Sequence, residues 1–366
     1  MNDDKRFQLA LSLTPGVGNV NTKNLISYCG SATAVFSSKT AHLNKIPGIG
    51  VKTIASIKNG SIIHEADKIL EDCEKNQIQI YHYTDENYPA RLKTIADAPS
   101  IIYASGKGNF NTKKILAIVG TRNATEYGLE ITRKIIADLA GSDVLIISGL
   151  AYGVDIEAHK ACLEMGVSTY GIMANGHHKI YPSQHKKIAS KMCDTGGLIS
   201  ENPPNKQAQA HFFPARNRII AGMSDAVLVV EAAAKGGALI TANIADSYDK
   251  YVFAVPGAIG SKYSEGCNNL IRNQKAYIYT GVKDLNYYLN WDQNEIITLQ
   301  KIIDRDLFSL DELKVYDLLA SANEAVHIDS IAWKTQLLIN EVAAHLLTLE
   351  FKGMVKSLPG KKFKLI

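Results

Sequence analysis

The residues with the clearest chemistry stand where an apolar run ends in glycine and arginine. Ile115–Val119 is continuously apolar, and Gly120, Thr121 and Arg122 follow it directly. After a polar turn, the amphipathic stretch Glu126–Ala140 predicts a helix. A strand that passes through a glycine into a helix start brings backbone N–H groups and a guanidinium to one spot, which suits an anion. We therefore expect Arg122 to hold a phosphate group.

The same motif argues against a nucleotide cofactor. The dinucleotide-binding fingerprint needs three glycines in the pattern Gly-x-Gly-x-x-Gly and an acidic residue for the ribose. Only Gly120 and Gly128 are present here, and no acidic residue marks a ribose site. We therefore expect no NAD and no other cofactor.

Cations, glycines and aromatic residues also follow the later apolar runs. The carboxyl ends of parallel strands meet at one edge of a sheet, where open α/β sheets bind their ligands. Glycine lets a ligand approach the backbone closely. The candidate ligand-binding residues are Gly120, Thr121, Arg122, Ser148, Gly149, Tyr152, Gly176, Lys179, Tyr181, Arg216, Asn217, Arg218, Lys235, Gly236 and Gly237. Together they predict a basic, glycine-lined groove.

Some of these residues have a purely structural alternative. Arg218 can form an ion pair within its own helix, and Lys179 can be a solvated loop charge. Arg122 differs, because the mouth of a strand has little structural need for a guanidinium, whereas a phosphate accepts two hydrogen bonds from it. A ligand-binding role is therefore the expectation for Arg122.

Aromatic residues beside the groove can stack on nucleobases, as they do in proteins that bind single strands. The candidates are Tyr152, Tyr181 and Phe212 or Phe213. Phe213 precedes Pro214, and we expect it to pack in the core instead. For Tyr181, stacking and core packing both remain open.

Two similar motifs near the start of the chain indicate helix-hairpin-helix units. Leu13–Gly18 and Ile46–Gly50 each contain Pro-Gly-apolar-Gly, with apolar residues before and a helical pattern after. Such a hairpin points the amides of its second helix outward, where they can take a DNA phosphate without contacting a base. Packing alone is the alternative, so DNA contact stays open. The candidate phosphate contacts are Gly16, Gly18, Gly48, Gly50 and Lys52.

The middle of the chain alternates apolar runs with helical patterns between residues 113 and 289. The runs are Leu116–Gly120, Val144–Ser148, Thr169–Met173, Leu198–Glu201, Ala226–Glu231, Val252–Gly257 and Ala276–Tyr279. Continuously hydrophobic strands separated by amphipathic helices are typical of a parallel sheet covered on both faces. The predicted fold class is α/β, a Rossmann-like doubly wound parallel sheet.

The end of the chain predicts a winged helix, with helices near Asp311–Ala320, Ile328–Lys334 and Ile339–Lys352 and a hairpin over Met354–Leu365. The third helix has no arginine, which favours protein contact over DNA. The basic wing is the argument for DNA, and its lysines are Lys356, Lys361, Lys362 and Lys364.

These patterns predict four parts of the chain. Residues 1–75 form a helical helix-hairpin-helix or SAM-like domain, and residues 76–290 form the Rossmann-like domain with its lead-in. Residues 291–304 form a linker, and residues 305–366 form the winged helix. A chain of 366 residues has room for several such cores.

Composition narrows the function classes. Forty Lys and Arg against 36 Asp and Glu give a net charge of +4, which permits nucleic acid without requiring it. No apolar stretch approaches the ~18 residues of a membrane span, and the start of the chain does not read as a signal peptide. We expect a cytoplasmic protein with no membrane partner.

No metal site is expected either. The five cysteines form no Cys-x-x-Cys pair, so neither a zinc cluster nor a disulfide framework is indicated. His177 and His178 are adjacent, and neighbours in sequence rarely bind one ion. We interpret them as polar loop residues whose charge varies with pH.

The segments that follow the strands resemble, in order and wording, the DNA-processing protein A family (DprA/Smf). They are Gly120–Arg122, Ser148–Asp155, Asn175–Pro182, Glu201–Pro204, Phe213–Gly222, Glu231–Gly237 with Leu239–Ala242, and Ala254–Gly257 with Glu265–Asn268. The resemblance covers nearly the whole chain. It implies a non-catalytic protein of natural transformation that binds and protects incoming single-stranded DNA, dimerises, and helps load the RecA recombinase.

One segment departs from that family. The usual Gly-x-Gly-Leu-Asp-x-x-Tyr-Pro is replaced by the sequence Asn175–Pro182, which has lost the Gly-Leu-Asp run. The conformation of this loop is therefore not implied by the resemblance.

An enzyme is the alternative function. Lys235–Asn243 resembles the Gly-Gly-x-Gly-Thr-x-x-Glu segment of nucleotide phosphoribohydrolases, but Asn243 replaces the glutamate that would act in glycosidic cleavage. Glu231 and Asp155 are other carboxylate candidates, and each can equally cap a helix or order a loop. A helix-hairpin-helix nuclease lacks support, because no Asp/Glu cluster has metal-binding spacing.

A homodimer is expected at the last strand of the sheet. Tyr277 lies in an apolar run at a predicted sheet edge, and exposed edges are usually covered. Leu270 and Ile271, just before it, offer an apolar patch for a two-fold contact.

Overall fold

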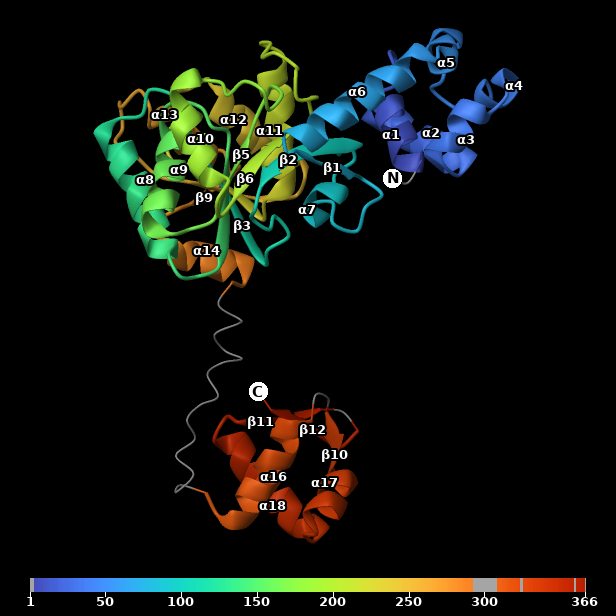
Figure 1. Cartoon of the computed structure of the whole chain (residues 1–366). Helices are drawn as coiled ribbons and strands as arrows, with labels where there is room; N and C mark the ends of the chain where they lie inside the picture. The colour runs from blue at the N-terminus through green and yellow to red at the C-terminus, as the bar shows by residue number, and fades with distance from the viewer. Residues whose placement is uncertain (1–2, 292–307, 323–324, 359, 366) are drawn as a thin grey trace. The chain divides into compact units, whose positions relative to one another are not determined.

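A computed structural model describes residues 3–291, 308–322, 325–358 and 360–365 (Figure 1). The chain divides into two compact units, Met1–Trp291 and Asp292–Ile366. Apart from Trp291, the predicted linker lies outside the described residues. Each unit has its own hydrophobic core.

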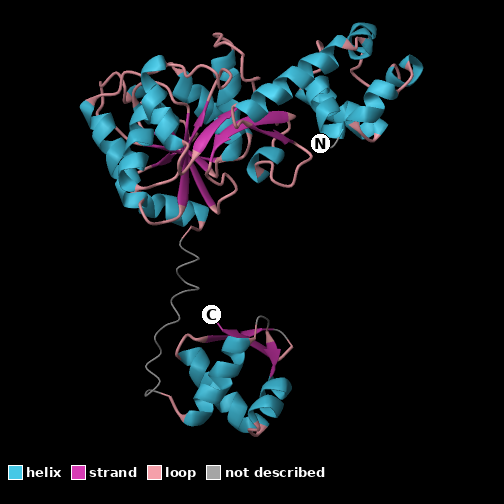
Figure 2. Cartoon of the chain, in the orientation of Figure 1, coloured by secondary structure: helices cyan, strands magenta, loops and turns pink. Residues whose placement is uncertain are grey.

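The first unit is built on a nine-stranded sheet with the order β1-β2-β6-β5-β4-β3-β7-β8-β9 (Figure 2). Strands β3 to β9 are parallel to one another, whereas β2 pairs antiparallel with both β1 and β6 at one side of the sheet. The strands are β1 (Gln79–His82), β2 (Ile101–Gly106), β3 (Lys114–Val119), β4 (Val144–Ser148), β5 (Thr169–Ile172), β6 (Gly197–Ser200), β7 (Ala226–Val229), β8 (Tyr251–Ala254) and β9 (Tyr277–Ile278).

The parallel part of the sheet confirms the predicted Rossmann-like class, and each of the seven predicted strands is present. The lead-in contributes two further strands, β1 and β2, which were not predicted. β1 has only partial burial and no continuous apolar run, so its sequence lacks the signal of the central strands.

Two layers of helices cover the sheet, as the alternation of side chains in β3 shows. Leu116 and Ile118 pack on one side, in the core that contains residues of α8, α9 and α14. Ile115 and Ala117 face the opposite core, with residues of α11 and α12. The helices are α7 (Ala90–Lys93), α8 (Glu126–Leu139), α9 (Val154–Met165), η1 (Ser183–His185), α10 (Lys186–Met192), α11 (Phe212–Met223), α12 (Gly237–Ser247), α13 (Glu265–Arg272) and α14 (Val282–Leu289).

The front of the chain is helical and contains both predicted hairpins. Its helices are α1 (Asp3–Leu13), α2 (Asn19–Cys29), α3 (Ala32–Ser37), α4 (Thr40–Leu43), α5 (Val51–Lys58) and α6 (Ser61–Lys75). Leu9 of α1 shares a core with Ile101 and Tyr103 of β2, so the predicted boundary after residue 75 lies inside one compact unit.

The second unit is a winged helix. The three predicted helices and the hairpin are present, and a short strand, β10, joins the hairpin in a three-stranded sheet. The elements are α16 (Leu310–Ser321), β10 (Val326–His327), α17 (Ile328–Thr335), α18 (Ile339–Phe351), β11 (Val355–Leu358) and β12 (Lys362–Leu365). Its core includes Val315, Ile331 and Leu346, one from each helix.

Candidate nucleic-acid interface

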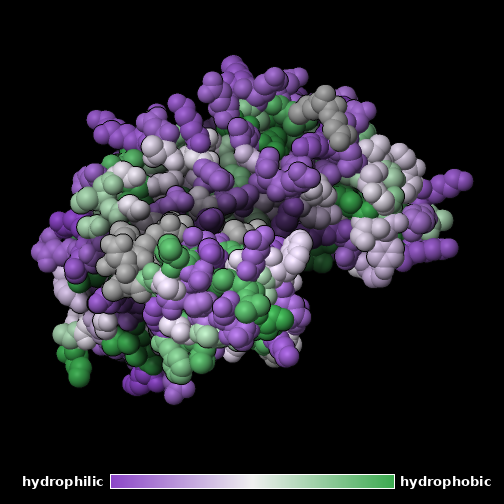
Figure 3. All heavy atoms as spheres, turned by 90° about the horizontal axis from the view of Figure 1, so that it is seen from below, coloured by the Kyte–Doolittle hydropathy of each residue, from purple (hydrophilic) through white to green (hydrophobic). Residues whose placement is uncertain are grey.

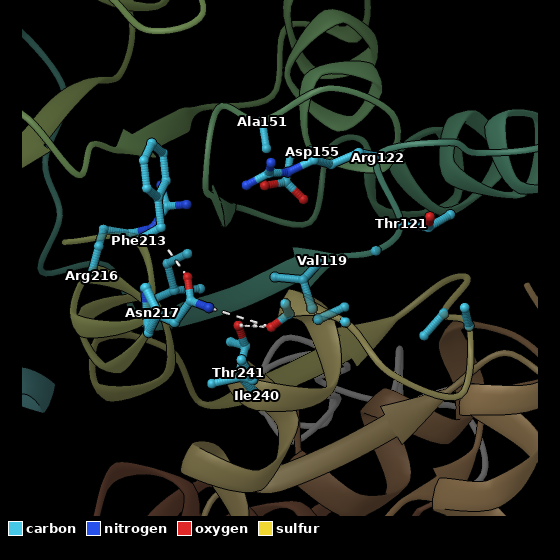
Figure 4. A pocket seen from close by; sticks show the side chains of 18 of the residues that line it. Val119, Thr121, Arg122, Ala151, Asp155, Phe213, Arg216, Asn217, Ile240 and Thr241 are labelled. Carbon is cyan, nitrogen blue, oxygen red and sulfur yellow. Dashed lines mark hydrogen bonds between the residues drawn. The ribbon is translucent and has the colours of Figure 1, made fainter. Parts of the chain in front are cut away.

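A pocket of about 610 Å³ opens at the carboxyl ends of β3 and β7 (Figure 4). β3 pairs with β4 on one side and with β7 on the other, so the chain order reverses at this point of the sheet. Loops that leave neighbouring strands in opposite directions open a crevice at such a reversal. The pocket therefore lies where a doubly wound sheet is expected to bind a ligand.

Nine of the fifteen predicted ligand-binding residues line this pocket. They are Gly120, Thr121, Arg122, Tyr181, Arg216, Asn217, Lys235, Gly236 and Gly237. The structure brings these positions together from the loop after β3, the loop after β5, helix α11 and the loop after β7. The parallel sheet accounts for this convergence, because it collects the carboxyl ends of its strands at one edge.

Arg122 and two aromatic rings form one wall of the pocket. The Arg122 side chain is exposed, and its guanidinium carbon lies 5.8 Å from the centroid of the Phe213 ring. The Tyr181 ring lies 5.6 Å from the Phe213 ring. The prediction that Phe213 packs in the core is wrong, because Phe213 is only half-buried and lines the pocket. Its place at the first turn of α11 points it toward the cavity (Figure 4).

The N-terminus of α12 forms the floor opposite that wall. α12 begins at Gly237, and no side chain caps its first turn. A side chain at Gly236 or Gly237 would meet no atom within 4 Å, so the backbone there is open. Lys235 is exposed beside it. An uncapped helix start with a neighbouring ammonium group is favourable for an anion.

Arg216 is a buried structural residue, and its predicted role as a free phosphate ligand needs correction. Its exposed fraction is 7%. Its guanidinium donates to the carbonyl oxygen of Gly149 at 2.5 Å and to the carbonyl oxygen of Ile172. Burial lowers the pKa of Arg216 to about 10, while nearby Asp155 acts in the opposite direction.

Asp155 completes this buried network. Its carboxylate accepts from the backbone N–H of Gly149 at 3.1 Å, and also from those of Gly120 and Ala151. Burial raises the pKa of Asp155, and Arg216 together with these N–H groups opposes the rise. The pair thus joins the loops after β3, β4 and β5. Sequence reasoning noted Asp155 only as a possible catalytic or ordering carboxylate, and the structure shows the ordering role.

Gly149 is part of the same network. A Cβ atom there would lie 2.6 Å from the Asp155 carboxylate and 2.7 Å from the Arg216 guanidinium. Its N–H and carbonyl are both bonded to that pair. Gly149 was predicted to contact the ligand directly. The structure corrects this prediction, because the missing side chain at Gly149 allows close packing within the protein.

Ser148 and Gly176 are also engaged inside the protein, which corrects their predicted ligand roles. The Ser148 hydroxyl is buried and donates to the carbonyl oxygen of Ile118 at 2.6 Å. The Gly176 N–H donates to the carbonyl oxygen of Lys206 at 2.8 Å, and a Cβ there would lie 2.0 Å from the Pro203 carbonyl oxygen.

Arg218 lies outside the pocket lining and forms ion pairs. Its guanidinium lies 2.6 Å from Glu201 and 3.4 Å from Asp97. Arg218 therefore has the structural role that was the alternative to ligand binding. Its ion-pair partners come from other segments and not from its own helix, as that alternative expected. Lys179 is exposed and Tyr152 donates its hydroxyl to Gln184 at 2.8 Å, and neither lines the pocket.

Comparison with known proteins identifies the family. The model of the DNA recombination-mediator protein A family matches residues 79–290, and the model of the DprA winged helix domain matches residues 308–361. The chain belongs to the DprA/Smf family. This result confirms the resemblance that the strand-end segments indicated.

Individual members of the DprA/Smf family match along most of the chain. Protein Smf of Synechocystis is 32% identical over 99% of this chain and 99% of its own length. The crystal structure of DprA from Streptococcus pneumoniae matches with a TM-score of 0.62 and 29% identity, over 78% of this chain and 97% of that one. DprA from Helicobacter pylori, a protein with a single-stranded DNA binding mode, matches with a TM-score of 0.53 and 28% identity, over 59% of this chain and 97% of that one.

The two hairpins at the front of this DprA/Smf chain pack against each other at equivalent positions. Gly16 and Gly48 have positive φ angles of +82° and +80°. A Cβ on Gly16 of the first hairpin would touch Thr53 of the second hairpin. A Cβ on Gly48 of the second hairpin would touch Asn21 of the first. Gly16 and Gly48 thus adopt the left-handed conformation that favours glycine.

The candidate phosphate contacts of the hairpins lie at helix starts. Gly18 and Gly50 precede α2 and α5, and neither helix has a side-chain cap. Lys52 is exposed in the first turn of α5. Packing accounts for Gly16 and Gly48, and DNA contact at the hairpins stays a prediction.

The predicted dimer residues divide into an exposed and a buried group. Tyr277 lies on β9, which is an edge of the sheet as expected, and its exposed fraction is 44%. Leu270 belongs to the core with 6% exposed, and Ile271 packs partly against that core. The prediction of an apolar surface patch at Leu270 is wrong, because α13 turns this side chain toward the sheet.

The altered loop contains one buried and one paired histidine. Burial lowers the pKa of His177 to about 4, so its charge does not vary near neutral pH, contrary to the prediction. The His178 ring lies 2.8 Å from the Asp72 carboxylate of α6. Asn175 closes the loop by donating to the carbonyl oxygens of Gly176 and Lys179.

The described residues contain neither a metal-binding group nor a helix that could span a membrane. No three His, Cys, Asp or Glu side chains within them are grouped to hold a metal ion. None of the helices in the described segments is long and apolar enough to cross a membrane.

Proposed function

We propose that this protein binds single-stranded DNA in the pocket between β3 and β7. The observation that carries the proposal is the combination of an exposed arginine, an uncapped helix start and two aromatic rings in one cavity. In this arrangement Arg122 and the first turn of α12 bind backbone phosphates. Phe213 and Tyr181 stack on bases, whose faces are accessible only in an unpaired strand.

The proposed role is non-catalytic. Among the described residues that line the pocket, Asp155 is the one carboxylate, and its oxygens are bonded to backbone N–H groups. Glu231 accepts from the N–H and hydroxyl of Thr125, at 2.9 and 2.6 Å. Asn243 does not line the pocket. A phosphoribohydrolase would need a carboxylate positioned for glycosidic cleavage, so incubation with nucleoside monophosphates should release no base.

The experiment that tests DNA binding compares labelled single-stranded and duplex oligonucleotides by fluorescence anisotropy over a range of salt concentrations. Single strands should bind more tightly, and the affinity should fall with salt by ~0.7 in log–log slope for each phosphate contact. Equal affinity for both forms would contradict the role of the aromatic wall. A slope near zero would contradict the role of the cations.

We also propose that the protein is a homodimer through the β9 edge. Tyr277, Ile278, Tyr251 and Tyr287 leave 40–78% of their surface exposed at or near this edge. Sedimentation velocity of Tyr277→Glu should show monomers, whereas Tyr28→Glu, an exposed tyrosine on α2, should sediment as wild type. A monomeric wild-type chain at micromolar concentration would exclude this dimer.

The finer role is proposed from family membership. In the cytoplasm, the protein protects an incoming strand during natural transformation and passes it to the RecA recombinase. Addition of the protein should shorten the lag before RecA assembles on a strand already coated by a single-strand-binding protein. An unchanged lag would remove the loading role and leave strand binding in place.

A further inference from the structure

The winged helix exposes an apolar surface where duplex-binding winged helices carry cations. We call it the α18 face, and it consists of large side chains that are 54–84% exposed. Its residues are Leu310, Trp333, Leu338, Ile339, Leu347 and Phe351. Hydrophobic side chains reach the surface in patches among hydrophilic ones (Figure 3), and the α18 face accounts for six large ones on one small unit.

Helix geometry makes the face continuous along α18. Ile339, Ala343, Leu347 and Phe351 are spaced by four residues, which keeps them on one side of the helix. Leu338 precedes the helix at one end. At the other end, Lys352 lies 4.2 Å from the Phe308 ring and 3.6 Å from Glu312, which brings the start of α16 and its Leu310 to the same end.

Two carboxylates belong to α18, and both are held by hydrogen bonds within the winged helix. Glu341 accepts from the Leu338 N–H in a capping box, and Glu350 accepts from the N–H and hydroxyl of Ser357. α18 has neither lysine nor arginine within Ile339–Phe351. The exposed lysines of the wing, Lys356, Lys361, Lys362 and Lys364, belong to β11, β12 and their turn. An apolar surface whose helix carries carboxylates and no cation does not complement a phosphate backbone.

We propose that the α18 face binds the α18 face of a second copy of this chain. Each anchor residue counts twice in an isologous contact, and the two carboxylates of α18 are already held by hydrogen bonds inside their own chain. At ~200 Å² per aromatic ring, Trp333 and Phe351 expose about 330 Å². The four aliphatic side chains bring the face toward the ~800 Å² that each partner gives to a standard interface.

Trp333 of α17 lies five residues before Leu338 and serves as the probe. The chain has two tryptophans, and Trp291 is buried with 6% exposed while Trp333 is 80% exposed. The variant Trp291→Phe therefore reports Trp333 alone. In the full-length variant that also carries Tyr277→Glu, which removes the proposed β9 dimer, acrylamide quenching of Trp333 should fall, and its emission should shift to the blue, as protein concentration rises from nanomolar to tens of micromolar.

Leu347→Glu in the same background tests the surface itself. A carboxylate within an apolar contact must be desolvated, which weakens the contact. The protein concentration at which Trp333 is half protected from acrylamide should therefore rise at least about tenfold. Ala320→Glu adds the same charge at an exposed position near the end of α16 and should leave the protection curve unchanged. If Leu347→Glu and Ala320→Glu reduced the protection of Trp333 from acrylamide equally, the result would contradict a role for the α18 face.

Three other outcomes would overturn the proposal. Trp333 that stays fully quenchable at every concentration has no partner in this chain. Protection that is independent of concentration places the occupant within the same chain. Protection that appears only after addition of a thymidine oligonucleotide makes the α18 face a DNA surface. Because the assay contains no DNA in its main arm, its failure leaves the proposed function of the pocket unaffected.

Discussion

Arg122 and Arg216 line the same pocket and have opposite environments. Arg122 follows β3, is exposed, and contacts the face of an aromatic ring. Arg216, from α11, is buried and donates to two backbone carbonyls beside Asp155. A guanidinium with a free donor set can exchange water for phosphate, whereas Arg216 already donates from Nε and Nη1 to groups of the protein. Proximity to a pocket therefore does not make a cation a ligand group.

The two arginines are connected through Asp155 and the backbone of Gly120. The Arg216–Asp155 pair ties the loop after β4 to the backbone of Gly120, which leads directly to Arg122. The exposed arginine is thus presented by a loop that the buried one helps to hold. Loss of Arg216 should affect binding only through the fold, whereas loss of Arg122 should affect binding alone.

The largest effect is expected for Arg216→Ala. Arg216 and Asp155 are buried opposite charges that stabilise each other electrostatically, so removal of Arg216 leaves an uncompensated carboxylate and should cost about 3–5 kcal/mol in free energy of unfolding. Urea denaturation followed by circular dichroism measures this loss. The double variant Arg216→Ala with Asp155→Ala should recover part of it, because no isolated charge remains. A singly substituted protein of wild-type stability that has lost DNA binding would show that Arg216 is a ligand group.

A smaller effect is expected from acidification, through a histidine next to the same network. His159 is buried, and its pKa is lowered to about 3, first by burial and then by His185 and Arg216. Below the unfolded pKa of ~6.5, the unfolded chain binds a proton at His159 that the folded chain excludes. The free energy of unfolding therefore decreases as the pH is lowered. Between pH 7.5 and 5.0 this costs about 2 kcal/mol at ~1.4 kcal/mol per pH unit.

Comparison of His159→Gln with wild type in urea at both pH values isolates this contribution. The pH-dependent loss of stability should be about 2 kcal/mol smaller in the variant. His64→Gln, an exposed histidine on α6, should retain the wild-type dependence. An identical pH dependence in all three proteins would mean that His159 is protonated without cost in the folded state.

The sequence predicted the elements whose signal is local. β3, β4 and β7 are buried on both faces, so their residues are continuously apolar and identify the parallel sheet. Arg122 and Lys235 directly follow two of these strands, so the topology alone places them at the ligand edge. The hairpin glycines were equally predictable, because a positive φ restricts the residue type.

The roles within α11 could not be predicted in this way. Arg216 and Arg218 are two positions apart and therefore point to nearly opposite sides of the helix. Which of them faces the pocket depends on how α11 is rotated by packing. The acceptors of Arg216 are backbone carbonyls 67 and 44 residues away in the sequence. Every residue has a backbone carbonyl, so the residue types give no sign of which ones accept from Arg216. Phe213 was misassigned to the core for the same reason.

Arg122→Ala tests the exposed side of the comparison. One lost phosphate contact should reduce the salt slope by ~0.7 and weaken single-strand binding about fivefold at 0.1 M salt, equally for every sequence. The melting temperature should not change, because no carboxylate partner is lost. Arg133→Ala is the matched control, since Arg133 of α8 pairs with Glu126 and Glu157. A folded Arg122→Ala protein with wild-type affinity would remove the proposed site.

The smallest effect is expected for Lys179→Ala. Lys179 is exposed on the loop before Tyr181 and does not line the pocket. Its charge acts on a bound strand only through solvent, where the Debye length is ~10 Å at 0.1 M salt. Its removal should therefore weaken binding less than about twofold and leave the salt slope unchanged. A loss equal to that of Arg122→Ala would show that the strand continues over the 175–182 loop. Exposure would then matter more than pocket lining in deciding which cations bind DNA.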